Sequence, residues 1–265
     1  MTNASNGCHS RGTYILTPAC YTQALHEVNR RPRHPTKQPH TTEPPATPPA
    51  PPRPARRDNG TMNTTTTRTA LIITANPEHH SLTNATGKAF AEGFHAHGGE
   101  TRILDLYDAG FNPVYTSADR AHYLGKADMP KDVAAIQARL AQADVIALVF
   151  PIYWYTMPAM VKGLFDRVIC RGFAYNADGT PGALAGKTVR VIMLTGGPES
   201  WYESDGIGEA LDNQIRRQTF MKYCGVKDVE IVYVDNLSMG DDDPAKREAA
   251  AKQLDGIRQL GASLA

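Results

Sequence analysis

Cysteine is scarce in this sequence, and no Cys-x-x-Cys pair occurs. The four cysteines are Cys8, Cys20, Cys170 and Cys224. We therefore expect neither a disulfide framework nor a zinc site, and a reduced, cytoplasmic setting fits best. Because no apolar run reaches the length of a membrane span, we expect no membrane insertion. Paired carboxylates, nucleophile triads and metal-ligand spacings do not stand out, and the acidic run 241–243 is most simply a helix start.

Large apolar residues are nearly missing from 30–57, the middle of an N-terminal segment rich in proline, threonine and arginine. Residues 1–68 hold 11 of the 19 prolines, with nine basic and three acidic residues. Such a segment cannot bury enough surface to offset its ordering entropy. We therefore predict a disordered or polyproline-like tail without function over 1–68 and one domain over 69–265. An SH3-type ligand, a nucleic-acid-binding arm and a targeting peptide are the alternatives for the tail.

After residue 68, short apolar runs alternate with stretches of helical spacing. We expect strands over 69–75, 101–107, 143–150, 188–197 and 229–235. We expect helices after Ser81 as N-cap, over 132–142, after Pro158, over 207–223 and from Asp243-Pro244, with 108–130 irregular. Strict alternation of strands and helices predicts an α/β fold: a doubly wound, five-stranded parallel sheet of order 2-1-3-4-5 with helices on both faces.

Ligands of such sheets bind at the carboxyl ends of the strands, beside the point where the strand order reverses. That rule brings three loops together, 76–82, 151–158 and 195–202. The first loop and its continuation, NPEHHSLT, lead into a helix N-terminus, where free N–H groups and the hydroxyls of Ser81 and Thr83 suit a phosphate. A plain capped helix is the alternative. The G-x-G-x-x-G fingerprint is missing here, which disfavours a nicotinamide-binding Rossmann site.

The other two loops carry an unusual amount of aromatic surface. Turns face water and are usually polar, yet Tyr153, Trp154 and Tyr155 follow one another in the second loop. The third loop, TGGPESWY, adds Trp201 and Tyr202, so these two loops hold both tryptophans of the chain. The rings either pack on the core or line a cleft for a flat ligand. With a phosphate loop beside them, we expect that ligand to be a flavin.

Several segments of the chain resemble the NAD(P)H:quinone oxidoreductases, a family of flavodoxin-like flavoproteins that includes DT-diaphorase. The segments are NPEHHSLT, DLYDAGFNPVYTSAD, FPIYWYTMPAMVKGLFDRVICRGFAY, TGGPESWY and YCG, and the resemblance covers about 69–262. It implies a flavodoxin-like fold and an NAD(P)H dehydrogenase (quinone). Such an enzyme passes hydride from NADPH or NADH through a flavin to a quinone-type acceptor by a ping-pong route. The long 108–130 segment resembles the FAD branch, although FMN remains an alternative.

The resemblance also implies roles for single residues. Around the flavin it implies Asn76 in the first loop, Ser81, Leu82 and Thr83 at the phosphates, Pro151, Ile152, Tyr153, Trp154 and Tyr155 at the isoalloxazine ring, and Thr195, Gly196 and Gly197 at its pyrimidine side. Tyr202 would bind the ring and support hydride transfer. Trp154 and Tyr175 would contact the substrate, with Tyr175 reaching over the flavin of a partner in a homodimer. We also expect 170–187 to need a partner's surface, because it has few apolar residues.

Two positions depart from the family pattern. Asn76 stands where the family usually has histidine, so it can donate a hydrogen bond but brings no charge. Gly208 stands where the diaphorase branch has a histidine after the loop tyrosine. No histidine follows His122, so a relay of charge from Tyr202 to a histidine cannot operate in this chain.

Three other functions stay open at this point. The acceptor could be an azo or nitro compound instead of a quinone. Some relatives act as ancillary regulatory subunits of potassium efflux systems. An electron-carrier flavodoxin is disfavoured, because such carriers are usually shorter and strongly acidic, whereas residues 69–265 carry a net charge of only about −5.

Overall fold

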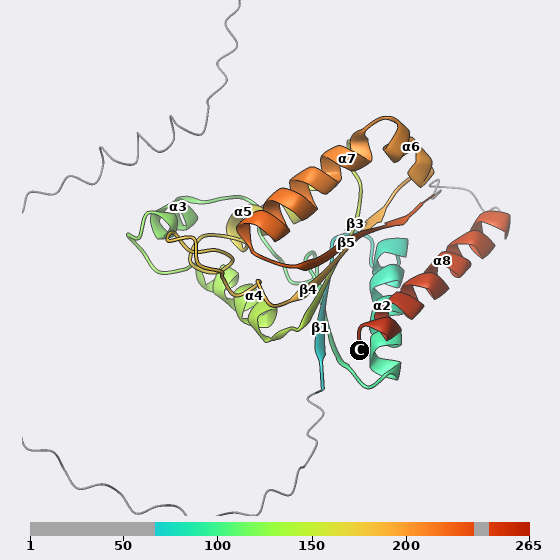
Figure 1. Ribbon diagram of the computed structural model, residues 1–265, viewed down its shortest axis with the longest axis horizontal. Helices are drawn as coiled ribbons and strands as arrows, with labels where there is room; N and C mark the ends of the chain where they lie inside the picture. The colour runs from blue at the N-terminus through green and yellow to red at the C-terminus, as the bar shows by residue number, and fades with distance from the viewer. Residues whose placement is uncertain (1–66, 236–243) are drawn as a thin grey trace, which may run out of the picture. The chain divides into compact units, whose positions relative to one another are not determined.

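Five parallel strands form one sheet in the order β2-β1-β3-β4-β5 (Figure 1). The structure, a computed structural model, describes residues 67–235 and 244–265, which belong to one compact unit, Met62–Ala265. The strands are β1 (Thr69–Thr74), β2 (Glu100–Asp105), β3 (Val145–Pro151), β4 (Thr188–Leu194) and β5 (Asp228–Val234). The predicted strand order is confirmed. The predicted tail, apart from residues 67 and 68, and the predicted cap Asp243 lie outside the described residues.

Helices cover both faces of the sheet (Figure 1). Phe90 and Phe94 of α2 (Leu82–Ala96) and Ile257 of α8 (Pro244–Ser263) pack on one face. The other face is covered by α4 (Lys131–Gln142), α5 (Ala159–Arg167), α7 (Ile207–Leu211) and η1 (Asp212–Tyr223). Because both faces are covered, β1, β3 and β4 are buried along almost their whole length. Within the described residues, no helix combines the length and the apolar character needed to cross a bilayer.

Two short helices lie in segments for which the sequence predicted none. The expectation that 108–130 is irregular was wrong, because α3 (Ser117–Tyr123) begins there with a capping box between Thr116 and Asp119. Buried Arg167 of α5 donates from Nε to Asp119 Oδ2 at 3.0 Å, which anchors α3 to the core. The second unexpected helix, α6 (Glu199–Ser204), occupies the third loop. The predicted helix over 207–223 is present, but from Asp212 onward it is a π-helix.

The segment 170–187 packs on its own domain, contrary to expectation. Ala174 and Leu184 are fully buried, and Phe173 and Tyr175 lie against the larger core cluster. Ala183 N donates to Phe173 O at 2.7 Å and closes the segment on itself. A few well-placed apolar side chains are therefore enough to pack this segment on its own domain. Its low apolar content is no evidence for a partner's surface.

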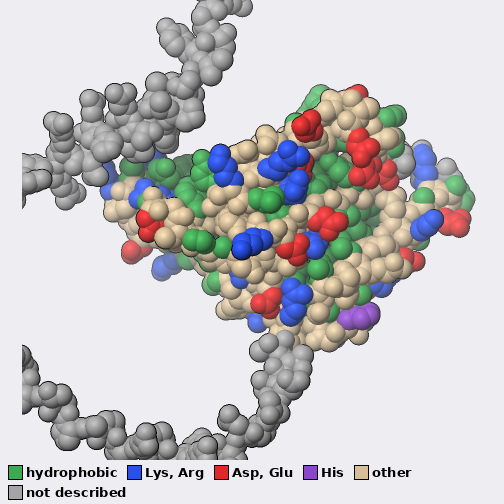
Figure 2. All heavy atoms as spheres, viewed as in Figure 1, with side chains coloured by type: hydrophobic (Ala, Val, Ile, Leu, Met, Phe, Trp, Pro, Cys, Tyr) green, Lys and Arg blue, Asp and Glu red, His purple; other side chains and the backbone are tan. Residues whose placement is uncertain are grey.

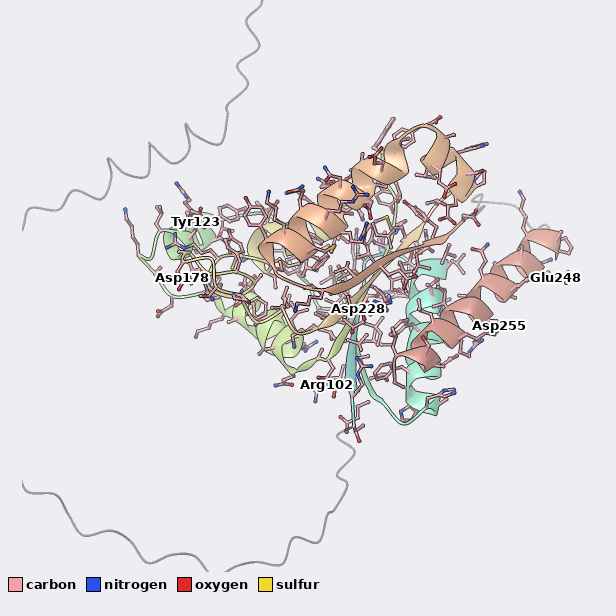
Figure 3. All side chains as sticks on the ribbon, in the orientation of Figure 1. Arg102, Tyr123, Asp178, Asp228, Glu248 and Asp255 are labelled. Carbon is pink, nitrogen blue, oxygen red and sulfur yellow. The ribbon has the colours of Figure 1, made fainter. Side chains whose placement is uncertain are left out.

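Charge is unevenly placed on the surface. Figure 2 shows acidic side chains gathered near α6 and basic ones over η1. At the edge strand β5, Arg190 Nη1 donates to Asp228 Oδ1 at 2.8 Å (Figure 3). These charges lie beside a groove lined by Glu199, Glu203, Arg216 and Arg217 among others. Among the three loops described next, the third contributes Glu199 to this groove.

Candidate functional site

The first loop is held in shape by its own side chains. Asn76 Nδ2 donates to Thr83 Oγ1 at 3.0 Å, and Asn76 Oδ1 accepts from Glu78 N at 2.9 Å. Ser81 is the N-cap of α2, as predicted, and its Oγ accepts from Asn84 N at 3.2 Å. The N–H groups of Leu82 and Thr83, in the first turn, have no acceptor within the described residues. This helix start can therefore bind an anionic group.

The end of β2 supports the first loop, which the sequence reading missed. Asn84 Nδ2 donates to Asp105 Oδ2 at 3.1 Å, and His79 Nδ1 lies 3.0 Å from Asp108 Oδ1. The pKa of Tyr107 is raised by burial and then by the nearby Tyr153 and Asp105. The sequence could have indicated these residues by their position, because Asp105 and Tyr107 stand at the carboxyl end of a strand, where such sheets bind ligands.

The second loop is a tight hairpin turn with two large side chains in a strained conformation. Tyr153 N donates to Thr156 O at 3.0 Å, and Thr156 N donates to Tyr153 O at 3.1 Å. Between them, Trp154 has φ 49° and Tyr155 has φ 60°, which is a type I′ turn that Asn-Gly would fill without strain. Trp154 is 89% exposed and Tyr155 61%. The alternative that these two rings pack on the core is therefore wrong.

The third loop carries a second exposed tryptophan. Trp201 is 64% exposed, and a Cβ added to Gly197 would lie 2.5 Å from Trp201 Cε3. Gly197 thus makes room for this ring. Thr195 is buried, and its Oγ1 donates to Gly197 O at 2.8 Å, which fixes the turn. Gly196 is exposed.

The second and third loops meet at the carboxyl edge of the sheet. Ile152 N donates to Leu194 O at 2.9 Å, next to Pro151, which pairs with Leu194. Tyr202 is half-buried, with its ring centroid 5.9 Å from that of Tyr233. The pKa of Tyr202 is raised by burial and then by the charge interaction with Tyr155. Exposed rings, unpaired amides and an anion-binding helix start fit a flavin.

Tyr175 lies elsewhere on the protomer. It lines a cavity with Tyr115, Tyr123 and Cys170, and none of the residues that line this cavity comes from the three loops. The structure of one chain thus brings Tyr202 to the aromatic turn but does not bring Tyr175 there. Among the described residues, no group of three or more His, Cys, Asp or Glu side chains is arranged to hold a metal ion.

Comparisons with known proteins agree with the fold. The family model of the flavodoxin-like fold matches residues 68–257. A Haemophilus influenzae protein named as an uncharacterized NAD(P)H oxidoreductase is 29% identical over 179 residues, covering 66% of this chain and 88% of that protein. Mouse ribosyldihydronicotinamide dehydrogenase [quinone] is 32% identical over 156 residues, covering 52% of this chain and 67% of that protein.

A solved structure shares the same architecture. It is the NAD(P)H:quinone oxidoreductase from Methanothermobacter marburgensis, with a TM-score of 0.67 and 26% identity, and the match covers 75% of this chain and 97% of that chain. The assignment to a family rests on the strand order, on the three loops at one edge of the sheet and on the family match over most of the chain. The chain belongs to the family with the flavodoxin-like fold.

Proposed function

We propose that the protein is a flavin-dependent NAD(P)H oxidoreductase whose acceptor is a quinone. The observation that carries this proposal is the turn at Trp154 and Tyr155, two exposed rings in a left-handed backbone conformation. Strained backbone of this kind is concentrated at functional sites, and an exposed aromatic turn is explained by a flat ligand that covers it. Relatives named as NAD(P)H oxidoreductases and as a quinone dehydrogenase support the same chemistry.

When bound, the flavin supplies the redox chemistry, since it accepts hydride from NADH or NADPH and passes two electrons to the acceptor. The chain supplies binding and orientation. In this proposal the start of α2, with Ser81, Leu82 and Thr83, holds the phosphate groups, and the segment Pro151–Tyr155 and the segment Thr195–Gly197 hold the ring. Asn76 acts through Thr83, to which it is hydrogen-bonded, and is therefore a positioning residue.

Tyr202 is proposed to donate a hydrogen bond to negative charge that develops on the ring. Because burial and the neighbouring Tyr155 raise the pKa of Tyr202, its hydroxyl stays protonated at neutral pH and can donate. Gly208 provides no side chain that could share this proton. The tyrosine therefore acts as a hydrogen-bond donor without a histidine relay.

We further propose a homodimer and a ping-pong cycle. Tyr175 lies away from the loops of its own chain, so in this proposal it completes the substrate side of a second copy's site. Donor and acceptor would then occupy the same aromatic-walled slot in turn. This proposal rests on Tyr175 alone, because 170–187 is already packed on its own domain.

An absorption spectrum of the purified protein tests the proposed function directly. We expect a yellow protein with one flavin per chain, and the mass of the released cofactor distinguishes FAD from FMN. Steady-state oxidation of NADH and NADPH with a quinone should give parallel double-reciprocal plots. Because Trp154 and Trp201 are exposed, bound flavin should quench tryptophan fluorescence. A colourless protein whose fluorescence ignores added FAD and FMN would contradict the proposal.

A further inference from the structure

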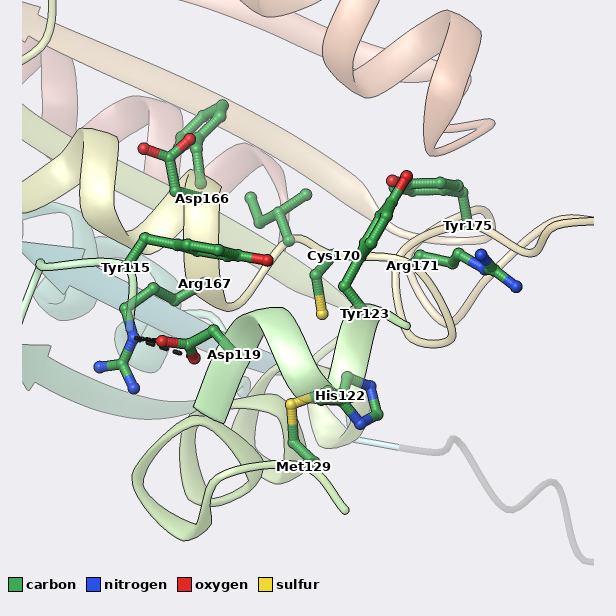
Figure 4. Close-up of a pocket in the computed structure, with 12 residues that line it drawn as sticks. Tyr115, Asp119, His122, Tyr123, Met129, Asp166, Arg167, Cys170, Arg171 and Tyr175 are labelled. Carbon is green, nitrogen blue, oxygen red and sulfur yellow. Dashed lines mark hydrogen bonds and ion pairs between the residues drawn. The ribbon is translucent and has the colours of Figure 1, made fainter. Parts of the chain in front are cut away.

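A cavity of about 270 Å³ lies between α3, the end of α5 and the segment 170–187 (Figure 4). Tyr115, Tyr123 and Tyr175 line it, together with Phe165 and Met129. Figure 4 shows the tyrosine rings of α3 and its surroundings on either side of Cys170. This volume lies just below the usual range of small-molecule sites, roughly 300–1,000 Å³, and therefore suits a molecule of one or two rings.

Two arginines lie against the ring of Tyr123, and one of them, Arg171, also lines the cavity. The guanidinium carbon of Arg171 lies 5.7 Å from the centroid of Tyr123, and that of Arg120 lies 5.4 Å from the same centroid. Within the described part of the chain, neither guanidinium forms an ion pair. A ring face offsets a positive charge only weakly, and two like charges on one ring repel each other. A bound anion would offset the positive charge of both guanidinium groups.

The carboxylates near the cavity are already engaged. Asp119 accepts two hydrogen bonds from the buried Arg167, and Asp166 pairs with Lys162. Asp178 (Figure 3), which does not line the cavity, accepts from Thr180 N at 3.0 Å and from Thr180 Oγ1 at 2.7 Å. Burial raises the pKa of Tyr175 and of Cys170, so both side chains are neutral at pH 7. Within the described residues, neither Arg120 nor Arg171 therefore has a carboxylate partner of its own.

We propose that this cavity binds aromatic anions, with the ring among the tyrosines and a carboxylate or sulfonate group on Arg120 and Arg171. A guanidinium group donates paired hydrogen bonds to such an oxyanion, and tyrosine rings provide rigid aromatic contact for the arene. This inference deepens the proposed function, and its catalytic part rests on the proposed homodimer, in which Tyr175 faces the flavin of a second copy. The preferred acceptors are then quinones that carry an anionic group.

Binding is tested first without turnover. Naphthalene-2-sulfonate, which the enzyme cannot reduce, is titrated by calorimetry into the full-length protein, with neutral 2-naphthalenemethanol as the matched ligand. We expect the sulfonate to bind more tightly, and Arg171→Gln and Arg120→Gln each to weaken it about tenfold. Arg139→Gln removes an exposed arginine of α4 and should leave the affinity unchanged. Equal affinity for the two ligands, or loss in the Arg139 variant alone, would overturn the inference.

Turnover then separates this inference from the proposed function. Two acceptors, the anionic quinone naphthoquinone-2-sulfonate and the neutral quinone menadione, are compared by their Michaelis constants in wild type and in the two arginine variants. We expect the ratio of the anionic to the neutral constant to rise about tenfold in each variant, and the constant for the sulfonate to rise with salt. An active enzyme with an unchanged ratio overturns the substrate preference. A protein without any reductase activity overturns the proposed function, while the calorimetry still decides what the cavity binds.

Discussion

Tyr202 is the residue on which the proposed chemistry depends most. Removal of a hydrogen-bond donor that is the main contact to an oxyanion costs about 10²–10³-fold in rate. Here backbone N–H groups would share that contact, so we expect Tyr202→Phe to slow flavin reduction roughly tenfold, about 1.4 kcal/mol. Stopped-flow reduction by NADPH and NADH measures this rate, and flavin affinity should barely change because the ring remains.

Tyr233 provides the control for that variant. Its ring lies beside that of Tyr202 in a tilted arrangement, so Tyr233→Phe removes a neighbouring hydroxyl and keeps the ring contact. We expect it to leave flavin reduction as it was. An unaltered rate in Tyr202→Phe would show that its hydroxyl does not face the flavin.

Some residue contacts of the site could be read from the sequence and others could not. Ser81 was predicted as a cap because a hydroxyl before an apolar periodic run is a local signal. The bond from Asn84 to Asp105 joins residues 21 positions apart, and no local pattern reports such a pairing. The sequence identified Asn76 as a departure from the family pattern. Its hydrogen bond to Thr83 depends on the path of the loop's backbone, which the sequence does not show.

The buried pair of Asp119 and Arg167 should make stability depend on pH. Burial alone would raise the pKa of Asp119, but hydrogen bonds from Thr116 and Arg167 outweigh it and lower the pKa below 3.8. The carboxylate therefore stabilises the fold above its ordinary pKa, and this contribution is lost as the pH falls through the lowered folded-state value.

Asp119→Asn tests this linkage. The variant leaves a buried arginine with one fewer carboxylate, so we expect it to lose about 3 kcal/mol of unfolding free energy at pH 7. The difference from wild type should shrink below pH 4, which urea denaturation at pH 7, 5 and 3 measures. Asp166→Asn, which breaks an exposed pair, should cost only about 0.3–0.5 kcal/mol. A deficit in Asp119→Asn that is constant with pH would contradict the linkage.

At the scale of elements, the aromatic turn lowers the stability of the fold while it provides the ring contacts of the proposed flavin site. Non-glycine residues in the left-handed region cost about 1–2 kcal/mol each, and Trp154 and Tyr155 both lie there. Replacing them by Asn-Gly should relieve most of this strain and raise Tm by about 3 °C or more. Flavin affinity should fall roughly tenfold or more as the ring contacts are lost.

Calorimetric melting of the cofactor-free proteins measures the stability gain without the contribution of ligand binding. Fluorescence titration with FAD and FMN measures the affinity loss. If the variant melts lower while it binds flavin normally, the turn is a packing element and the proposed site is misplaced.

The regular elements were predictable where local signals were strong. Buried strands such as β3 are continuous apolar runs, and the start of α2 carries a hydroxyl cap. The short helix α3 was missed because its residues are mostly polar, and its order depends on Arg167 from a distant helix. The helix α6 was missed because Trp201 and Tyr202 suggested a loop, although Pro198 occupies its N-cap position and Glu199 lies in its first turn. The π-helix η1 has no local signature that periodicity or capping would show.

At the scale of the whole molecule, strand order followed from alternation, because right-handed crossovers leave few topologies for such a chain. The oligomeric state has no comparable rule. The argument from apolar content failed at 170–187, where Ala174 and Leu184 are buried within one chain. What remains is geometric: Tyr175 lines a cavity that excludes the three loops of its own protomer. This position is expected if each site takes Tyr175 from a second copy.

Subunit complementation tests the proposed homodimer. Trp154→Ala removes part of the flavin wall, and Tyr175→Ala removes the substrate contact, so each variant alone should be nearly inactive as a dimer. In a two-fold dimer both surfaces occur twice, and a mixed dimer then has one intact site out of two. Equal amounts of the two variants, unfolded and refolded together, should give half mixed dimers and thus about a quarter of wild-type activity. If Tyr175 served its own chain's site, no mixture would recover activity. Sedimentation of the wild type must show a dimer at the assay concentration, because a fully active monomer excludes the shared site outright.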